Sequence, residues 1–217
     1  MPDFARTPRA TVRRKAQRAS YARTDVNAIL DEAPFCSVGF VEDGRPVVIP
    51  INHWRIGDSL YFHGSPASRL LGVLCAGAEV CVTATLVDGW VLARSAARHS
   101  TNYRSAVVFG RAREVTDRAA KMAAFAALIE RLAPGRWAEV RPPSDSELDS
   151  VRMAALPLEE ASVKMRAGPP ADTEEDHALP VWAGVVPMRL VAGPPVPDDG
   201  LDPAIPLPEC LKPRNEA

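Results

Sequence analysis

The sequence predicts a mainly antiparallel β-barrel of six strands with peripheral helices, and two observations point to this class. Turn signals at Asp43-Gly44, Gly57-Asp58 and Asp88-Gly89 join neighbouring strand-like runs into hairpins, whose strands pair antiparallel. Only one helix is expected between these runs, which favours a closed barrel over a parallel sheet. The runs are rich in Val, Ile, Phe and Thr and span residues 35–41, 46–54, 59–63, 79–86, 90–95 and 106–115.

Two short helices are expected to flank the first strands. Residues 24–33 have apolar side chains at helical spacing, with Thr24 as the N-cap and Pro34 as the stop. After strand 59–63, Ser65 is expected as an N-cap, Pro66 occupies the first helical position and Gly77 ends the helix. The chain between strand 59–63 and Gly77 therefore predicts a strand that runs directly into a helix.

A longer helix is predicted from Thr116 and Asp117 through Leu132. Its apolar stripe is expected to pack into the core and consists of Met122, Phe125, Ile129 and Leu132. Further along the chain, residues 144–153 give a weaker helix prediction, 158–166 a possible strand and 168–176 a polar loop.

Length and composition predict one domain with two extensions. The chain has 217 residues, of which 47% are hydrophobic, so it can bury a sizeable core. A basic arm (1–23) precedes the barrel domain (24–190), and a Pro-rich tail (191–217) is expected to be extended or disordered. The arm lacks a groove-reading motif for nucleic acid, so we expect a solvated arm that packs across a partner subunit. Its cations include Arg9, Arg13, Arg14, Lys15 and Arg18.

Charge, cysteine spacing and hydropathy exclude several classes of protein. The net charge is −1, from 26 basic and 27 acidic residues, which gives no overall bias toward nucleic acid or anionic membranes. The four cysteines have no C-x-x-C spacing, which indicates reduced thiols. No apolar stretch approaches the roughly 20 residues that cross a bilayer, and the Arg-rich start lacks the apolar core of a secretory signal. The sequence therefore predicts a cytoplasmic protein.

Metal, nucleophile and Rossmann motifs are not found. If Gly57-Asp58 is a two-residue turn, Asn52 lies opposite His63, and His53 points to the other face of the hairpin, so the two histidines cannot share a metal. There is no H-E-x-x-H, no G-x-S-x-G and no strand-to-helix G-x-G-x-x-G. We therefore expect no structural metal.

The strand-to-helix segment Tyr61–Leu71 is a candidate phosphate site. Free backbone N–H groups at the helix start, the hydroxyls of Ser65 and Ser68, and the guanidinium of Arg69 could converge on one dianion. The alternative is an ordinary capped helix with an exposed arginine.

A second segment, His99-Ser-Thr-Asn-Tyr-Arg-Ser105, leads directly into the strand-like run 106–115. Together with Tyr61–Arg69, Pro134–Trp137 and Pro180–Pro187, it resembles the flavin-nucleotide-binding proteins of the pyridoxamine 5′-phosphate oxidase-like superfamily. The similarity runs from about Tyr21 to Pro187 and is greatest to the branch near the nitroimidazole-resistance proteins. This resemblance implies a split barrel, FMN as cofactor, and a homodimer with two equivalent flavin sites at the subunit interface.

The resemblance also implies which residues contact the flavin. His63 falls where the nitroimidazole-resistance branch has a functional histidine, and it is the candidate catalytic residue. Asn102–Ser105 match a segment that reaches the cofactor from the neighbouring subunit or closes the site. Tyr103 and Trp182 could instead be interface core, and Arg104 could pair with a carboxylate. The candidate cofactor-binding residues are Pro50, Asn52, His63, Gly64, Ser65, Ser68, Arg69, Asn102, Tyr103, Arg104, Ser105 and Trp182.

Three functions remain open. The first is an FMN-dependent oxidoreductase, of flavin reductase or nitroreductase type, that uses a nicotinamide donor and a small-molecule acceptor. The second is a haem- or other tetrapyrrole-binding protein on the same barrel, with His63 or His99 as axial ligand. The third is a non-enzymatic flavin-binding or interaction protein. Oxidation of pyridoxamine phosphate is not expected, because the family's basic pair is reduced here to Arg69 followed by Leu70.

Overall fold

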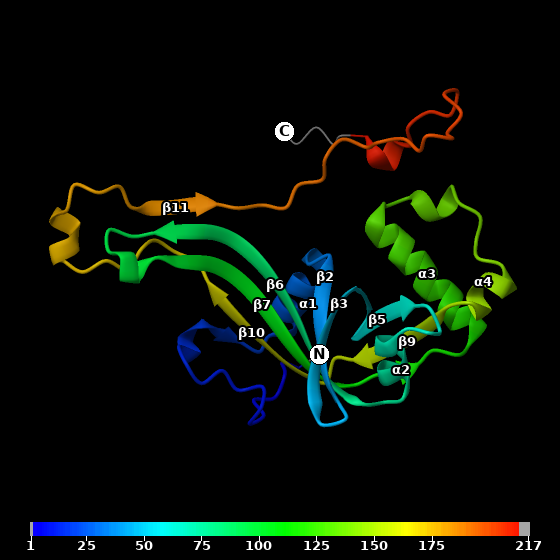
Figure 1. Cartoon of the computed structure of the whole chain (residues 1–217), viewed down its shortest axis with the longest axis horizontal. Helices are drawn as coiled ribbons and strands as arrows, with labels where there is room; N and C mark the ends of the chain where they lie inside the picture. Colours follow the sequence, from blue (N-terminus) through cyan, green and yellow to red (C-terminus); the bar gives the residue numbers. More distant parts are fainter. Residues whose placement is uncertain (1, 213–217) are drawn as a thin grey trace.

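The computed structural model describes residues 2–212, which form two antiparallel sheets with helices on the outside (Figure 1). In the larger sheet the strand order is β1-β10-β7-β6-β2-β3, and β11 pairs with β6. In the smaller sheet the order is β4-β5-β9-β8. The mainly β class with peripheral helices is confirmed, and the barrel is split because the two sheets do not close into one cylinder.

The strands of the larger sheet are β1 (Ala19–Ser20), β2 (Phe35–Glu42), β3 (Arg45–Asn52), β6 (Glu79–Leu92), β7 (Ser100–Arg111), β10 (Glu160–Arg166) and β11 (Gly184–Pro187). Those of the smaller sheet are β4 (Trp54–Ile56), β5 (Ser59–Gly64), β8 (Arg113–Glu114) and β9 (Arg152–Pro157). The α-helices are α1 (Arg23–Glu32), α2 (Arg69–Cys75), α3 (Arg118–Leu132) and α4 (Asp145–Asp149). The 3-10 turns are η1 (Ala16–Arg18), η2 (Ala96–Arg98), η3 (Arg136–Ala138), η4 (Glu175–Ala178) and η5 (Glu209–Leu211).

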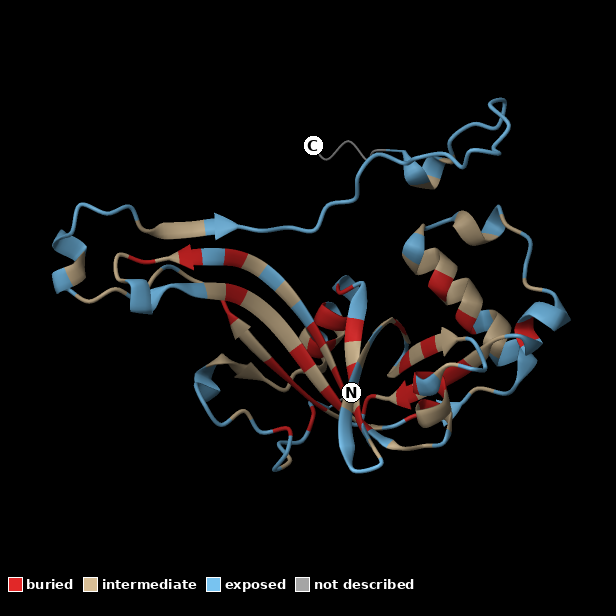
Figure 2. Cartoon of the chain, viewed as in Figure 1, coloured by how far each residue is buried: buried red, intermediate tan, exposed pale blue. Residues whose placement is uncertain are grey.

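The core lies where the two sheets and α1 meet (Figure 2). One row of cross-strand partners shows how it is built, because Val38 faces Val82, Val82 faces Val108 and Val108 faces Ala161. All four side chains are fully buried. β-branched residues pack well at such positions, since each covers its neighbours on the pleated surface.

Two of the three predicted hairpins are confirmed, and the third is wrong. Glu42 pairs with Arg45 across Asp43-Gly44, and Ile56 pairs with Ser59 across Gly57-Asp58. Asp88-Gly89 instead lies inside β6, where the pairing with β7 shifts register between Val87 and Gly89. The chain continues as one strand here, because β7 pairs along one edge of β6 and β11 pairs along its other edge.

The continuous strands β6 and β7 form a ribbon that projects from the body of the molecule, with β11 alongside (Figure 1). We call the outer part of this ribbon, residues 87–105, together with β11, the arm. The segment His99–Ser105, which the sequence places before a strand, is itself mostly strand, because β7 begins at Ser100. Its side chains therefore alternate between the two faces of the arm.

The helix ends differ in detail from the sequence prediction. Helix α1 has Ala22 at its N-cap, and no side chain caps it, so Thr24 does not take that role. Helix α2 starts later than expected, with Ser68 as N-cap, because the Ser68 hydroxyl accepts a hydrogen bond from the Leu71 amide. Pro66 and Ala67 form a turn before it, closed by a hydrogen bond from the Ser68 amide to the Ser65 carbonyl. Helix α3 has the expected start, with Asp117 as N-cap.

The apolar stripe of α3 is not fully buried, contrary to the prediction. The buried residues of this helix are Ala124 and Leu128, whereas Phe125 is half-buried and Leu132 is 67% exposed. Ala124 and Leu128 thus make the close contact with the barrel, and Leu132 remains at the surface. The side chains that the sequence assigns to the core are therefore available to line a site.

The N-terminal segment packs on its own barrel. The Phe4 side chain belongs to the main core, and β1 pairs with β10. Thr7 and Arg9 both bind the Glu160 carboxylate. The expectation that the basic N-terminal segment is solvated is therefore wrong for residues 4–10 and for β1, although Arg13, Arg14 and Lys15 are exposed.

The chain after β11 is extended and lies over the open side of the molecule (Figure 1). Its exposed apolar residues include Leu190, Val191 and Val196. In the part of the chain that the structure describes, no helix is long and apolar enough to cross a membrane.

We predict that Gly89→Ala will release β11 from the arm without unfolding the barrel. A Cβ atom at Gly89 would lie 2.8 Å from the Val186 carbonyl oxygen and 3.0 Å from Val185 Cγ1, which is too close for β11 to stay paired. Trypsin should then cut faster at Arg189, as followed by mass spectrometry.

The matched control is Gly72→Ala in α2, where an added Cβ meets nothing within 4 Å. This variant should be cut at the wild-type rate. Unchanged cleavage of Gly89→Ala would show that the pairing of β11 tolerates a side chain here.

Candidate functional site

The side chain of His63, near the end of β5, lies in a cluster of aromatic rings. Its ring centroid is 5.5 Å from that of Trp54 and 5.7 Å from that of Phe125, and both contacts are edge-on, with interplanar angles of 68° and 72°. Trp54 in turn stacks on Tyr61 at 5.9 Å. Edge-to-face packing holds the imidazole in place without using its nitrogen atoms.

Two buried polar atoms of this cluster have no hydrogen-bond partner among the described residues. They are Nδ1 of His63 and Nε1 of Trp54. A buried polar atom without a partner typically costs about 1–3 kcal/mol, so such atoms are rare in folded proteins. Two such atoms on rings that contact each other mark the place where a polar group from outside the protein would be stabilised.

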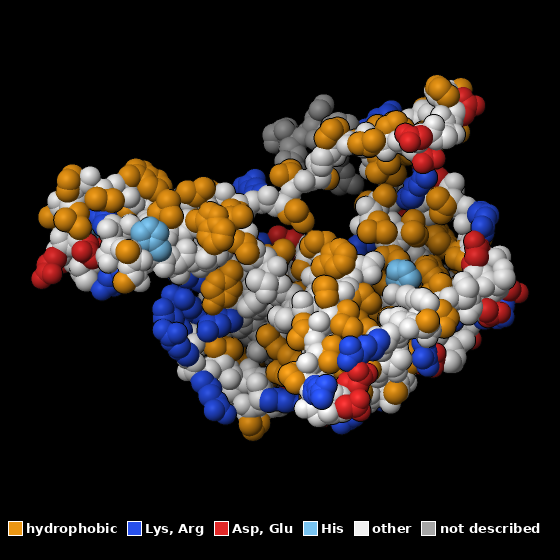
Figure 3. Space-filling model, in the orientation of Figure 1, with side chains coloured by type: hydrophobic (Ala, Val, Ile, Leu, Met, Phe, Trp, Pro, Cys, Tyr) orange, Lys and Arg blue, Asp and Glu red, His pale blue; other side chains and the backbone are white. Residues whose placement is uncertain are grey.

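Burial lowers the pKa of His63 below its usual value. The imidazole is therefore neutral at pH 7, and one ring nitrogen keeps a free lone pair. A neutral imidazole can accept a hydrogen bond or bind a metal ion held by a cofactor. Hydrophobic side chains gather on the surface over β5 and α3 (Figure 3).

The chain after His63 turns sharply onto α2. Gly64 allows this turn, because a Cβ at that position would lie 3.3 Å from Leu71 Cδ2. The Ser65 hydroxyl accepts from the Ala67 amide, and the Ser68 hydroxyl accepts from the Leu71 amide. Each hydroxyl retains its own proton for donation to a ligand.

Arg69 is the first residue of α2, and its side chain is 53% exposed. Its guanidinium group forms an ion pair with Glu42 and lies 5.8 Å from the ring centroid of Phe40. A phosphate at this point would compete with the Glu42 carboxylate for the guanidinium. An exposed ion pair of this kind is worth little, so the competition is weak.

Strand β3 carries Pro50 and Asn52 at the edge of the larger sheet. Pro50 pairs with Ser37 and is exposed, and Asn52 pairs with Phe35 and is half-buried. Phe35, whose side chain is 60% exposed, is a large apolar side chain open to solvent beside this strand. An edge strand next to an exposed aromatic ring offers a flat apolar wall for a planar ligand.

The second group of expected site residues lies on the arm. Asn102 is buried, and its amide binds the Gly168 carbonyl and the Arg166 guanidinium. The Ser105 hydroxyl donates to the Lys164 carbonyl. Tyr103 is half-buried, and Trp182 is 66% exposed.

Arg104 forms ion pairs with Glu32 and Asp88. These contacts raise the pKa of Arg104 and lower that of Glu32. Arg104 and its two carboxylate partners line a groove of about 770 Å³ between α1, the arm and the start of the tail. Apolar side chains that line the groove include Phe35, Leu86, Met188 and Leu190.

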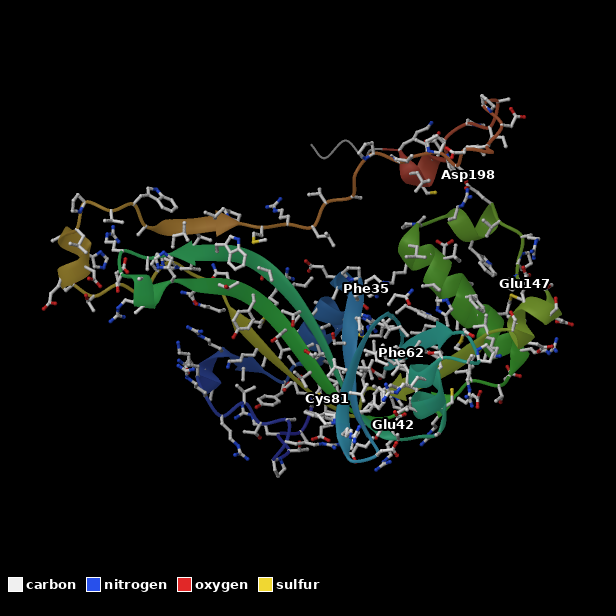
Figure 4. All side chains as sticks on the ribbon, in the orientation of Figure 1. Phe35, Glu42, Phe62, Cys81, Glu147 and Asp198 are labelled. Carbon is white, nitrogen blue, oxygen red and sulfur yellow. The ribbon has the colours of Figure 1, made fainter. Side chains whose placement is uncertain are left out.

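Within one chain, the candidate site residues around Arg69 do not meet those on the arm around Arg104. Arg69 pairs with Glu42 at one end of β2, whereas Arg104 shares its groove with Phe35 at the other end. Figure 4 shows Phe35 and Glu42 at opposite ends of this strand. Eight residues of extended chain put these ends about 23 Å apart.

Several residues of the site were not identified from the sequence. Trp54 could have been found, since the two-residue turn at Gly57-Asp58 puts it on the same face as His63. Phe125 was assigned to the core because a helical stripe does not show which part of it is covered. The carboxylates that pair with the two arginines come from distant elements and leave no local signal.

Comparison with known proteins identifies the family. The family model described as pyridoxamine 5′-phosphate oxidase matches residues 22–165. The chain belongs to this family. None of the curated protein sequences matches the chain.

Two of the matching solved structures resemble nearly all of this chain. The flavocytochrome Anf3 from Azotobacter vinelandii is 41% identical, with a TM-score of 0.89 over 96% of this chain and 97% of the other. The FAD and haem binding protein from Mycobacterium smegmatis is 38% identical, with a TM-score of 0.86 over 89% and 95%. A structure assigned as a 5-nitroimidazole antibiotic resistance protein from Bacteroides thetaiotaomicron is 23% identical, with a TM-score of 0.55 over 67% and 85%, and shows the fold alone.

The second histidine of the β3–β5 region does not belong to the site. His53 is 1% exposed, and its Nε2 atom lies 2.9 Å from the Leu30 carbonyl oxygen of α1. In the described residues, no group of three or more His, Cys, Asp and Glu side chains could hold a metal ion. The role of His53 is therefore to join α1 to the barrel.

We predict that His53 makes the fold sensitive to acid. Burial lowers the pKa of His53 to about 4, from 6.5. Because the unfolded chain takes up the proton first, stability falls as the pH drops from about 6.5 through about 4. This shift corresponds to a loss on the order of 3 kcal/mol.

Urea unfolding at several pH values in this window should show a smaller loss for His53→Gln than for the wild type. His99→Gln, at an exposed histidine, is the control and should behave as the wild type does. Equal acid sensitivity of His53→Gln and wild type would contradict the assignment.

Proposed function

We propose that this chain is a flavin-dependent redox protein that binds a flavin nucleotide between β3, the end of β5 and the start of α2. The observation that carries the proposal is the His63 cluster, where a neutral imidazole with an unpaired nitrogen adjoins the Ser65–Arg69 segment. Membership of the pyridoxamine 5′-phosphate oxidase family supports it, as do the flavin-binding names of the two whole-chain relatives.

The phosphate of FMN would be bound by Arg69 and the hydroxyls of Ser65 and Ser68. The same phosphate is present in FAD, which is the flavin named for the relative from Mycobacterium smegmatis. Helix α2 has seven residues, and the Ser68 cap occupies the Leu71 amide, so side chains rather than the helix dipole must supply most of the binding. The flavin, once bound, supplies hydride transfer, and His63 would orient a substrate beside its ring.

A homodimer would bring the two groups of site residues together. Because Arg104 and Arg69 lie at opposite ends of β2, the arm could complete a site only on another copy of the chain. The exposed rings of Trp182, Trp90 and Phe35 support this arrangement, since aromatic side chains are enriched at interfaces. We also propose a cytoplasmic location, a small-molecule substrate and a nicotinamide electron donor.

Haem is a second ligand that a specific observation favours. The two relatives at 41% and 38% identity are named as a flavocytochrome and as a FAD and haem binding protein. In this chain, His63 is a neutral imidazole among aromatic rings on an apolar surface, which is the donor and the setting that a haem iron needs. We propose His63, rather than His99, as the axial ligand, because His99 is exposed whereas His63 lies among aromatic rings.

We predict that Arg69→Ala will weaken FMN binding by about 2 kcal/mol, or roughly thirty-fold, because it removes a charge-assisted contact to phosphate. Riboflavin, which lacks the phosphate, should bind nearly as it does to the wild type. Flavin fluorescence titrations of both ligands give the decisive ratio of affinities.

Glu42→Gln is the matched variant, since it frees Arg69 from its competing carboxylate. This variant should bind FMN more tightly, with riboflavin again unchanged. If the FMN-to-riboflavin ratio is the same in wild type, Arg69→Ala and Glu42→Gln, the phosphate does not bind at Arg69.

We predict that His63→Ala will abolish the Soret band of protein purified with haem, because no other described imidazole faces this cluster. His99→Ala should keep the band. A colourless wild-type protein that does not take up added haem would rule out the haem proposal and leave the flavin proposal to the FMN titration. Loss of the band in His99→Ala instead would move the ligand to η2 and the arm.

A further inference from the structure

A second, strongly basic pocket lies on the other side of the molecule from α3. It has a volume of about 460 Å³ and lies between η1 and the end of β10. Its walls include Gln17, Arg18, Arg166, Gly168 and Pro169. None of the candidate flavin residues lines it.

The positive charge around this pocket is not compensated. Arg14, Lys15 and Lys164 lie near Arg18 and Arg166, and all four neighbours lower the pKa of Lys15, with Arg18 the largest influence. Among the described residues, none of these five cations forms an ion pair with a carboxylate, whereas Arg9, Arg69 and Arg104 all do. Figure 3 shows Lys and Arg side chains gathered below the arm.

Arg166 lines the pocket and is 9% exposed. Its guanidinium donates to the Asn102 side-chain oxygen, to the Gly168 carbonyl at 3.3 Å and to the Pro169 carbonyl at 3.0 Å. All three acceptors are neutral. A buried cation without a counter-ion is costly, and the three neutral acceptors offset only part of that cost.

Lys15 adds a backbone cost at the same place. Its φ of 56° and ψ of 54° lie in the left-handed region, which a residue with a side chain rarely occupies. A glycine would remove both this strain and one of the clustered charges. Crowded like charges and a buried guanidinium, which both oppose folding, therefore meet at this pocket, and the strained lysine lies beside it at the start of η1.

We propose that this pocket binds the oligophosphate group of a small ligand, such as a nucleoside diphosphate. Arg18 and Arg166 line the pocket, and Arg14, Lys15 and Lys164 add positive charge near it. This arrangement matches several negative charges held close together, as in a diphosphate. A polymeric nucleic acid fits less well, because its phosphates follow an extended groove and could not reach the buried Arg166. Binding an oligophosphate would neutralise the charges that the folded chain leaves unpaired.

The test is calorimetric titration of the full chain with inorganic pyrophosphate. Arg18→Gln and Lys15→Gly should each weaken binding by roughly ten-fold, the usual effect of losing one charged contact. Lys15→Gly should also melt at the wild-type temperature or above it, because strain and repulsion are removed. Lower affinity with equal or higher stability separates a ligand-binding role from a structural one.

Two control variants match the two changes made at Lys15. Asp43→Gly relieves the second left-handed non-glycine residue found among residues 2–212, whose φ is 50°, without removing a cation. Arg113→Gln removes an exposed cation outside the pocket. Both should bind pyrophosphate as the wild type does. Wild-type protein that does not bind pyrophosphate, equal affinity in all variants, or tighter binding of single-stranded DNA of about 20 nucleotides at the same salt concentration would overturn the proposal.

The source of the diphosphate is settled by repeating the titration with flavins. If the pocket holds the diphosphate of FAD, Lys15→Gly weakens FAD but not FMN, and FAD-loaded protein no longer binds pyrophosphate. If the pocket serves a separate nucleotide, FAD-loaded protein still binds pyrophosphate. Pyrophosphate binding to flavin-free protein tests the pocket alone, so its failure is distinguishable from a failure of the flavin proposal.

Discussion

The pairing of β6 with β7 is the interaction on which the rest of the structure depends. It runs from Glu79 opposite Arg111 to Val91 opposite Ser100, and it also holds β2, β10 and β11 through their pairing with these two strands. Near the body its side chains, such as Val82 and Val108, are fully buried, whereas Val87 and Trp90 on the arm are 41% and 49% exposed. One ladder therefore builds both the core and the projecting arm.

The split between the sheets creates the candidate site. Strand β3 ends at Asn52 and β4 starts at Trp54, so the chain changes sheets at His53, which α1 holds through the Leu30 carbonyl. This change brings Trp54 beside His63 and leaves the edge strand β3 and Phe35 exposed. The acid-sensitive contact of His53 and the neutral imidazole of His63 therefore both depend on this change of sheet between β3 and β4. The two side chains point to opposite faces there.

Charge is distributed unevenly over the molecule. Arg69 and Arg104, the two arginines of the candidate flavin site, are both paired with carboxylates, so any anion must displace a partner there. At the pocket of Arg18 and Arg166 no described carboxylate has to be displaced, and the cations repel one another. An anion would therefore gain more at the second pocket than at the first, for the same number of contacts. The contrast makes the two sites separable by experiment.

The sequence by itself determined the class of fold, the first two hairpins, the place of α2 after β5 and the opposite orientation of His53 and His63. These features depend on local signals, namely turn residues, strand periodicity and stop residues, which act within a few positions of the chain. The tertiary structure alone decided that Asp88-Gly89 continues a strand, because the partners β7 and β11 come from elsewhere in the chain. It also decided which face of α3 is covered, that Phe4 belongs to the core, and that Glu42, Glu32 and Asp88 pair with the site arginines. Contacts between distant segments depend on how the whole chain packs, and local sequence patterns do not encode them.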